Sequence, residues 1–430
     1  MELLLIGVMV VLLTLLLYIA HNSAEGLKFI LYGVSTYLFI SYILRPLIFI
    51  SSRDQNISNP IYDSRLGQNP GEFISLMSLI ILGYFVFCIP FLLKNHKKVD
   101  ENTEQINSNN YQEFVWIISY GLLCGILALF IESTTLKNPF SKSLVPLVSI
   151  CFSIFLWKRK ELRLTKTINV VILTCGCIST ILFSMASNNS KGILLFPCVV
   201  YISTLKIWKE VGLYFKKTLF MILLLITFIP AFSKLQNIKL GDSVVAAITS
   251  NQENFSWYLS PFIETANRFD MFARVADSYF AEPGSLGGLG SWINYFLESL
   301  KWNPGSGRTQ NSFGQDWNQL ITNQSLSGSR FSNVSLAQGM IAEGYIWFGV
   351  TSLILECLLF SIIFMYVAKF LEGGPLSLIF AFGIISNGAI FESGSIQFAG
   401  ILSATLKVFF FIWVSKKIWS ANLRYKKFRI

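Results

Sequence analysis

The residues best suited to chemistry form a run of acidic and basic side chains between positions 264 and 277. Glu264 and Arg268 lie four residues apart. Asp270 and Arg274 repeat that spacing, and Asp277 follows three residues later. Side chains at these spacings are neighbours on one helix face, where each pair adds only about 0.2–0.5 kcal/mol to an exposed helix. The same arginines could instead hold phosphate oxygens through their planar, bidentate donors.

Aromatic and basic residues surround this run in the sequence. Trp257 precedes it, Trp302 follows it, and a Gly/Ser-rich stretch then leads to Arg330. Trp rings present large apolar faces with a polar edge, which suits stacking on the apolar faces of sugars. Arginines, carboxylates and aromatic rings together would therefore suit a sugar that is linked to a lipid phosphate at a membrane surface.

The chain that positions these groups has the composition of a membrane protein. Of its 430 residues, 53% are hydrophobic and 13% are charged, and the mean hydropathy is +0.56. Its apolar runs reach about 20 residues, the length that a helix needs to cross a bilayer. Strands of a membrane barrel would alternate apolar and polar residues instead. The sequence therefore predicts an all-α fold, a polytopic bundle of transmembrane helices.

Eleven apolar runs divide the chain into three parts. Residues 1–232 carry eight runs, residues 233–338 form one large polar loop, and residues 339–430 carry three runs and a basic tail. The expected spans are 2–20, 27–50, 74–93, 113–131, 139–157, 168–186, 193–208, 214–232, 342–368, 376–392 and 398–415. The first run lacks a basic leader and a small-residue cleavage site, so we interpret it as a retained span.

Lys and Arg are distributed unevenly between alternate connections. One side carries twenty of them, and the short loops of the other side carry five. The side richer in positive charge is the cytoplasmic one. The amino terminus and the large loop are thus expected outside, and the carboxyl terminus inside. This asymmetry accounts for much of the net charge of +10, so the charge does not indicate nucleic-acid binding.

Two amphipathic helices are expected in the large loop. Apolar residues recur at helical spacing from 260 to 280. From about 290 to 301, the same spacing places Trp292 and Phe296 on one face. The stretch 304–329 is rich in Gly, Ser and Asn and is predicted to be a loop.

Three charged residues fall inside predicted spans, where a charge is costly and is a candidate for function. Arg45 lies near the outward end of the second span, where it could act or could simply snorkel to the surface. Glu356 and Lys407 lie near the middle of two other spans. We favour a structural pair between these two over a catalytic role.

Histidine and cysteine give no sign of a metal or redox site. All seven cysteines lie in apolar runs, and Cys175 and Cys177 point to different sides of a helix, as packing residues would. His21 and His96 fall in cytoplasmic connections, so an outward general base would have to be Asp or Glu. The sequence has no HExxH, no P-loop and no acidic metal motif, and it indicates neither a metal nor another cofactor.

Several short motifs resemble those of one family. Residues 330–349 read RFSNVSLAQGMIAEGYIWFG, with an acidic residue (Glu343), a Tyr and a Phe-Gly. Residues 44–47 read LRPL, and residues 189–192 read NSKG. These stretches are similar to the segment after the large loop, the Arg-Pro element and the Ser-Arg/Lys-Gly element of O-antigen polymerases, the Wzy-type oligosaccharide repeat-unit polymerases. In the loop itself, RFD at 268–270 and LKWNP at 300–304 resemble further features of that family.

The resemblance implies a metal-independent glycosyltransferase. Such an enzyme moves a growing glycan from its undecaprenyl-diphosphate carrier onto a hydroxyl of the next lipid-linked repeat unit, which makes an O-antigen, capsule or exopolysaccharide. It must stabilise a departing diphosphate and remove a proton. The expected roles are diphosphate binding by Arg45, Lys191, Arg268 and Arg274, catalysis by Arg330 with Asp270 or Glu343 as the base, and sugar binding by Trp257 and Trp302.

The resemblance also implies a setting and partners. The protein would lie in the cytoplasmic (inner) membrane with its large loop on the periplasmic or extracellular side, and it would work with a chain-length regulator and a flippase. Two other classes stay open. A lipid-linked glycan ligase would share this layout, although we would expect a His in its loop. A flippase or transporter of lipid-linked oligosaccharide would use intramembrane charges such as Arg45, Glu356 and Lys407.

The predicted topology can be tested with reporter fusions. A reporter that is active only outside the cell should be active after Asn251, in the large loop, and inactive after Lys160, in a cytoplasmic connection. The scheme is wrong if both fusions report the same side of the membrane.

Overall fold

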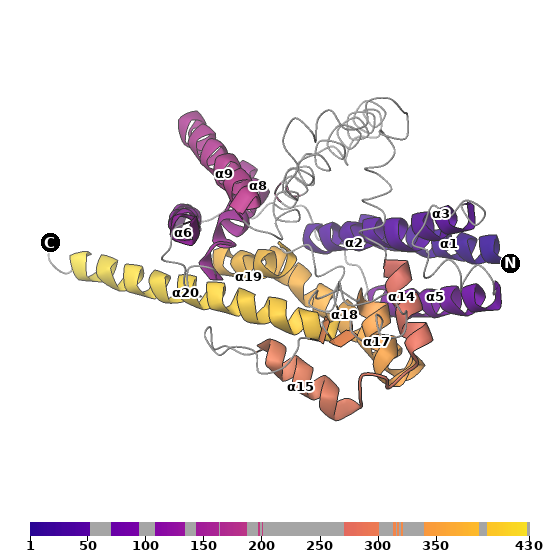
Figure 1. Cartoon of the computed structure of the whole chain (residues 1–430). Helices are drawn as coiled ribbons and strands as arrows, with labels where there is room; N and C mark the ends of the chain where they lie inside the picture. Colours follow the sequence, from indigo (N-terminus) through magenta and orange to yellow (C-terminus); the bar gives the residue numbers. More distant parts are fainter. Residues whose placement is uncertain are drawn as a thin grey trace, which may run out of the picture.

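Every regular element in the described part of the chain is helical. The computed structural model describes residues 1–51, 70–93, 108–133, 143–162, 164–186, 271–300, 339–386 and 394–427, together with 197, 200, 313–314, 316–317 and 320. The elements are α1 (Glu2–His21), α2 (Glu25–Leu38), η1 (Phe39–Leu44), α3 (Arg45–Ser51), α5 (Pro70–Leu93), α6 (Ser108–Ser133), α8 (Leu147–Leu162), α9 (Lys166–Ala186), α14 (Met271–Ala281), α15 (Leu289–Leu300), α17 (Gly339–Phe348), α18 (Val350–Leu371), α19 (Pro375–Ile385) and α20 (Ser395–Lys427). Figure 1 shows α1, α2 and α5 together near the amino terminus, and α20 running away toward the carboxyl terminus.

Six stretches of the described residues are long and apolar enough to cross a membrane, which confirms a multi-pass helical membrane protein. They are Glu2–His21, Glu25–Ile50, Pro70–Leu93, Tyr111–Ile131, Val350–Leu371 and Ser395–Ala421. The expected runs at 193–208 and 214–232 lie outside the described residues, as does most of the large loop. The total of eleven spans therefore stays a prediction.

The second expected span is a continuous helix with a π-helical centre. α2, η1 and α3 follow one another from Glu25 to Ser51. At the end of η1 the backbone N–H of Arg45 donates to the carbonyl of Ile40, five residues back. Pro46 comes next, and a proline ring crowds the carbonyl four residues before it. A wider turn relieves that crowding, and such turns are frequent at functional sites.

The ninth expected span, 342–368, is wrong as a single helix. α17 ends at Phe348 and α18 begins at Val350. Gly349 between them has a φ of 67°, a left-handed conformation that glycine adopts at little steric cost. The short helix α17 packs against the loop helix α14, whereas α18 is long enough to span the membrane.

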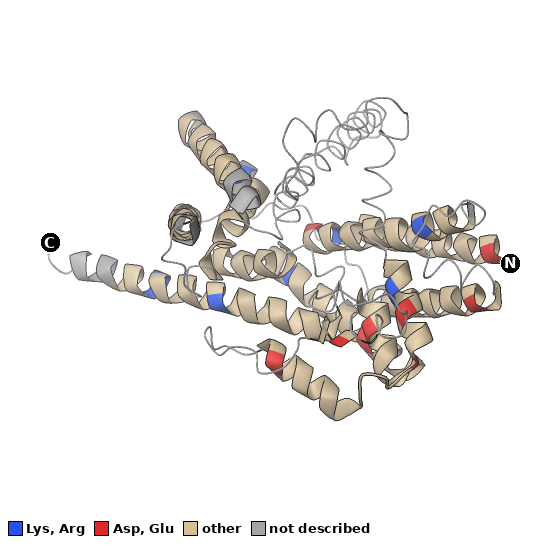
Figure 2. Cartoon of the chain, in the orientation of Figure 1, with Lys and Arg blue, Asp and Glu red and all other residues tan. Residues whose placement is uncertain are grey.

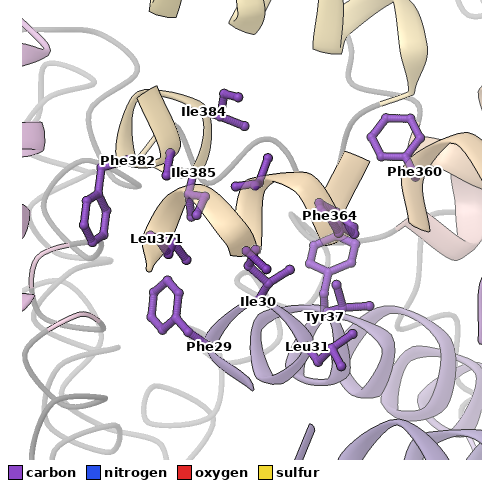
Figure 3. Packing of buried hydrophobic residues seen from close by; sticks show 14 of the residues in the cluster. Phe29, Ile30, Leu31, Tyr37, Phe360, Phe364, Leu371, Phe382, Ile384 and Ile385 are labelled. Carbon is purple, nitrogen blue, oxygen red and sulfur yellow. The ribbon is translucent and has the colours of Figure 1, made fainter. Parts of the chain in front are cut away.

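The main apolar core joins helices from both ends of the chain. Figure 3 shows Ile30 of α2 and Leu371 of α18 in the same cluster, and both are buried. A series of rings extends this contact, because Phe29 lies 5.4 Å from Trp157 of α8, and Trp157 lies 6.0 Å from Phe382 of α19, between ring centroids. Packing of this kind is a principal source of helix association in a bilayer.

Two loop helices are described. α14 confirms the second part of the helix expected at 260–280, while 260–270 lie outside the described residues. α15 confirms the helix expected at 290–301, and its Trp292 and Phe296 rings stack with centroids 5.2 Å apart. Within the stretch expected to be a loop, residues 313–314, 316–317 and 320 are helical. The reason is burial, since Phe313 and Trp317 pack in an aromatic cluster.

α6 and α8 approach closely at Gly125. A Cβ atom at this position would lie 2.8 Å from the backbone nitrogen of Val148 on α8. Backbone atoms cannot move aside as the end of a flexible side chain can. Small residues at such contacts let membrane helices pack tightly.

Replacing Gly125 with Leu should therefore destabilise the protein. Overpacking of this kind costs about 1–3 kcal/mol, which should lower the melting temperature of the purified protein in detergent. Gly7→Leu is the matched control, because a Cβ at Gly7 meets nothing within 4 Å. Equal melting temperatures for the two variants would contradict the packing seen here.

Candidate functional site

Arg274 and Glu343 lie on two helices that pack against each other. Ser278 Oγ on α14 donates a 2.9 Å hydrogen bond to the carbonyl of Ala342 on α17. Arg274 Nη1 donates to Asp277 Oδ2 at 3.2 Å, which confirms the expected i,i+3 pair. The Asp277 side chain is 1% exposed and that of Arg274 is 26% exposed. The arginine side chain therefore stays partly exposed while it pairs with a buried carboxylate.

Arg45 lies on a third element of the same group. α14 packs against η1 and α5, and the Phe272 ring lies 6.3 Å from Phe49 of α3 and 5.8 Å from Phe73 of α5. In Figure 1, α3, α5 and α14 lie at the same end of the molecule as the amino terminus. Arg45 is only 5% exposed. A snorkelling side chain would reach water, so this burial argues against that alternative.

Two buried carboxylates bind the first turn of α20. Ile396 N donates to Glu343 Oε1 at 2.7 Å, and Ser395 Oγ donates to the same oxygen at 2.9 Å. Ser395 N donates to Glu356 Oε1 at 2.5 Å. The first N–H groups of a helix have no partner within the helix, and carboxylates suit its positive end. Glu343 of α17 and Glu356 of α18 thus act together as an N-terminal cap.

The hydroxyl of Ser395 also connects this cap to the loop helix α15. Trp292 Nε1 donates to Ser395 Oγ at 3.2 Å. Ser395 accepts from the indole and donates to Glu343, so one side chain joins α15, α17 and α20. We call Glu343, Glu356, Ser395 and Trp292 the carboxylate cluster. Figure 2 shows acidic residues gathered where α14, α17 and the start of α20 meet.

Close contacts at two glycines, Gly344 and Gly394, let the two carboxylates lie at the start of α20. A Cβ at Gly344 would lie 3.0 Å from Glu356 Cβ, so the glycine lets α18 approach α17 beside Glu343. A Cβ at Gly394 would lie 2.2 Å from Glu343 Oε2. This oxygen is buried and has no hydrogen-bond partner among the described residues. The cluster is therefore closed, with Glu343 fully buried and Glu356 8% exposed.

The expected pair of Glu356 and Lys407 does not form. Glu356 accepts from Ser395, at the start of α20. Lys407 lies twelve residues further along that helix, about 18 Å at 1.5 Å per residue. The helix terminus takes the place of the lysine as the partner of the carboxylate.

A second cluster consists of aromatic rings that lie between α15, α17 and the helical residues 313–317 that the structure describes. Phe313 and Trp347 stack with centroids 5.5 Å apart, and Trp317 is fully buried. Tyr295 donates a hydrogen bond to Asp316. Burial, and then that hydrogen bond, raises the pKa of the Tyr295 phenol. Because Trp317 and Trp347 are buried, their faces are not open to a sugar, and the cluster serves to pack α15 against α17.

Three of the nine expected site residues lie in the described part of the chain, on α14 itself or on helices that contact it. These are Arg45, Arg274 and Glu343. The other expected site residues lie outside the described residues, namely Lys191, Trp257, Arg268, Asp270, Trp302 and Arg330. Within the described ranges, no three His, Cys, Asp or Glu side chains group as a metal site would need.

Sequence reasoning missed Ser395, Gly394 and the indole N–H of Trp292 as members of the cluster. A usable signal was present, since Gly394-Ser395 directly precedes an apolar run, as residues at a helix start often do. The expected span began only at 398, after this start. The hydrogen bond from Trp292 has no such signal, because the two residues are 103 positions apart in the sequence and meet only through tertiary packing.

Gly394→Ala should disturb the cluster, because its new Cβ would meet the Glu343 carboxylate. We expect a loss of about 1–3 kcal/mol of stability, measured as a lower melting temperature. Gly400→Ala, on the same helix, is the matched control, since its Cβ meets nothing within 4 Å and alanine favours the helix. An unchanged melting temperature for Gly394→Ala would show that the carboxylate does not lie against this backbone.

Three comparisons with known proteins bear on whether this arrangement belongs to a recognised site. No family model matches the chain, and no curated protein or solved structure matches it either.

Proposed function

We propose that this protein is a membrane glycosyltransferase that polymerises undecaprenyl-diphosphate-linked oligosaccharide repeat units at the outer face of the cytoplasmic membrane. One observation carries the proposal. Arg45 and Arg274 are far apart in the sequence, yet the helix that begins at Arg45, α3, meets α14, which carries Arg274, through the Phe49 and Phe272 rings. The resemblance to O-antigen polymerases assigns both arginines to the diphosphate. A shared location is what a single site requires.

The arginines have the chemistry that a diphosphate leaving group needs. Negative charge grows on the leaving diphosphate as the sugar is transferred, and fixed positive groups stabilise it. Arg274 keeps an exposed part beyond its bond to Asp277, so it can receive a phosphate at the surface of the bundle. Arg45 is buried, lies near the predicted outward end of its span, and would hold the deeper phosphate. The predicted Lys191, Arg268 and Arg330 would complete this binding site.

We assign the general base to Asp270 in preference to Glu343. Glu343 is fully buried, and its Oε1 already accepts two hydrogen bonds. A base must come within hydrogen-bond reach of the acceptor hydroxyl. Asp270 directly precedes α14 in the sequence and is four residues from Arg274. In this proposal Glu343 holds the helices that carry the site, and Trp257 and Trp302 contact the sugars.

The proposal is tested with the purified protein and a lipid-diphosphate-linked oligosaccharide, without added metal. The wild type should make a ladder of repeat-unit products. Arg274→Ala should reduce the ladder by about 10²-fold, the usual cost of removing one donor to a developing charge. Arg274→Lys keeps a charge for Asp277 but loses the bidentate fork, so it should give an intermediate yield with a normal melting temperature.

Lys158→Ala is the control for loss of one positive charge. Lys158 pairs with Glu161 on α8, in a predicted cytoplasmic connection, and should not affect the ladder. A full ladder from Arg274→Ala would remove the arginine from the site. No ladder from the wild type, with the lipid-linked substrate moved between leaflets of liposomes, would favour a flippase instead.

A further inference from the structure

We infer that Glu343 and Glu356 share one proton, and that this proton holds the loop helix α15 on the membrane bundle. The inference goes beyond the proposed function and does not depend on it. It rests on the carboxylate cluster, where two acidic side chains from different helices meet at one helix start.

The positive end of α20 offsets less than one of the two negative charges that the pair would carry if both carboxylates were ionised. Both carboxylates bind Ser395, and Glu343 also binds Ile396 N. A helix N-terminus carries roughly half a unit of positive charge. Two carboxylates that share a site cannot both ionise easily, because each disfavours charge on the other. Burial adds to this effect, since an uncompensated buried charge is strongly destabilising.

No described cation lies against the pair to balance a second charge. The titratable groups of the packed elements include Arg274, Asp277 and Tyr279 on α14, Tyr295 and Glu298 on α15, Tyr345 on α17, Cys357, Tyr366 and Lys369 on α18, Tyr84 and Cys88 on α5, and Lys407, Lys416 and Lys417 on α20. Lys369 lies thirteen residues from Glu356, about 20 Å along α18. Arg274 binds Asp277, and Lys407 lies about 18 Å along its helix from Ser395. α19 carries no charged residue, and Glu72 on α5 lies eleven residues before Gly83, where α5 meets Cys357. With no cation against the pair among the described residues, a proton can supply the balance.

The bonding pattern leaves room for that proton. Glu343 Oε1 accepts two hydrogen bonds, while Glu343 Oε2 is buried and finds no partner in the described part of the chain. A buried ionised oxygen with no donor is costly, whereas a protonated one carries no charge. The proton is taken from solvent and returned to it, so no other reactant is needed.

Loss of the proton should release α15. With both carboxylates charged, their repulsion would separate α17 and α18 at the cap and disturb Ser395, which is the residue that Trp292 binds. The folded state gains this proton, so the stabilisation is present at low pH and is lost as pH rises. Glu356→Gln leaves one carboxylate at the helix start, which mimics the singly protonated pair and cannot be deprotonated further.

Infrared difference spectroscopy tests the shared proton. The wild type should show the carbonyl stretch of a protonated carboxylic acid that disappears at alkaline pH. Glu343→Gln and Glu356→Gln should each remove this band, because a single remaining carboxylate ionises. Asp277→Asn should keep it, since Asp277 pairs with Arg274. No band in the wild type, or a band that survives in either Gln variant, would overturn the shared proton.

Hydrogen–deuterium exchange of residues 289–300 tests the link to α15. After correction for the intrinsic chemical rate, exchange in the wild type should become about tenfold faster at alkaline pH, as expected for loss of one buried hydrogen bond. Exchange in Glu356→Gln should not change with pH. A wild type without pH dependence, or a Glu356→Gln variant with the same dependence, would show that the proton does not control α15.

Discussion

The backbone N–H groups at the start of α20 need hydrogen-bond acceptors, and the contact among α15, α17, α18 and α20 depends on that need. A helix start that is buried in a bundle must find acceptors for its N–H groups, since water cannot supply them. Here the acceptors are two carboxylates, which themselves would be too costly to bury without those donors. Each side of the contact therefore requires the other. That mutual requirement fixes α17 and α18 against α20, and Ser395 extends it to α15 through Trp292.

The same contact places the loop helices relative to the membrane helices. α17 is held by the carboxylate cluster at Glu343 and receives the hydrogen bond from Ser278 of α14 next to it, at Ala342. α14 in turn meets α3 and α5 through Phe272. A path of direct contacts thus runs from α20 to the helix that carries Arg45. In the proposed enzyme, this path keeps the two arginines at one place while lipid-linked substrates enter and leave.

Much of the helical layout could be predicted from apolar runs alone, because length and hydropathy decide which segments cross a bilayer. Local exceptions came from residues with special backbone behaviour, since Gly349 divides one predicted span and Pro46 follows a π-helical turn within another. The partner of Glu356 could not be predicted. A charge in a span calls for a counter-charge, and Lys407 was the obvious choice, but a helix terminus met the same need. Such a partner depends on packing and leaves little trace in the spacing of residues.

The central claim is that Glu343 and Glu356 together hold the first turn of α20. Amide exchange at single-residue resolution, measured on the protein in nanodiscs, tests it most directly. Ser395 and Ile396 should exchange slowly, although the first amides of a helix are usually unprotected. Glu356→Ala should speed exchange at Ser395, Glu343→Ala should speed it at Ile396, and the middle of α20 should keep its protection in both. Fast exchange at these two amides in the wild type would contradict the claim.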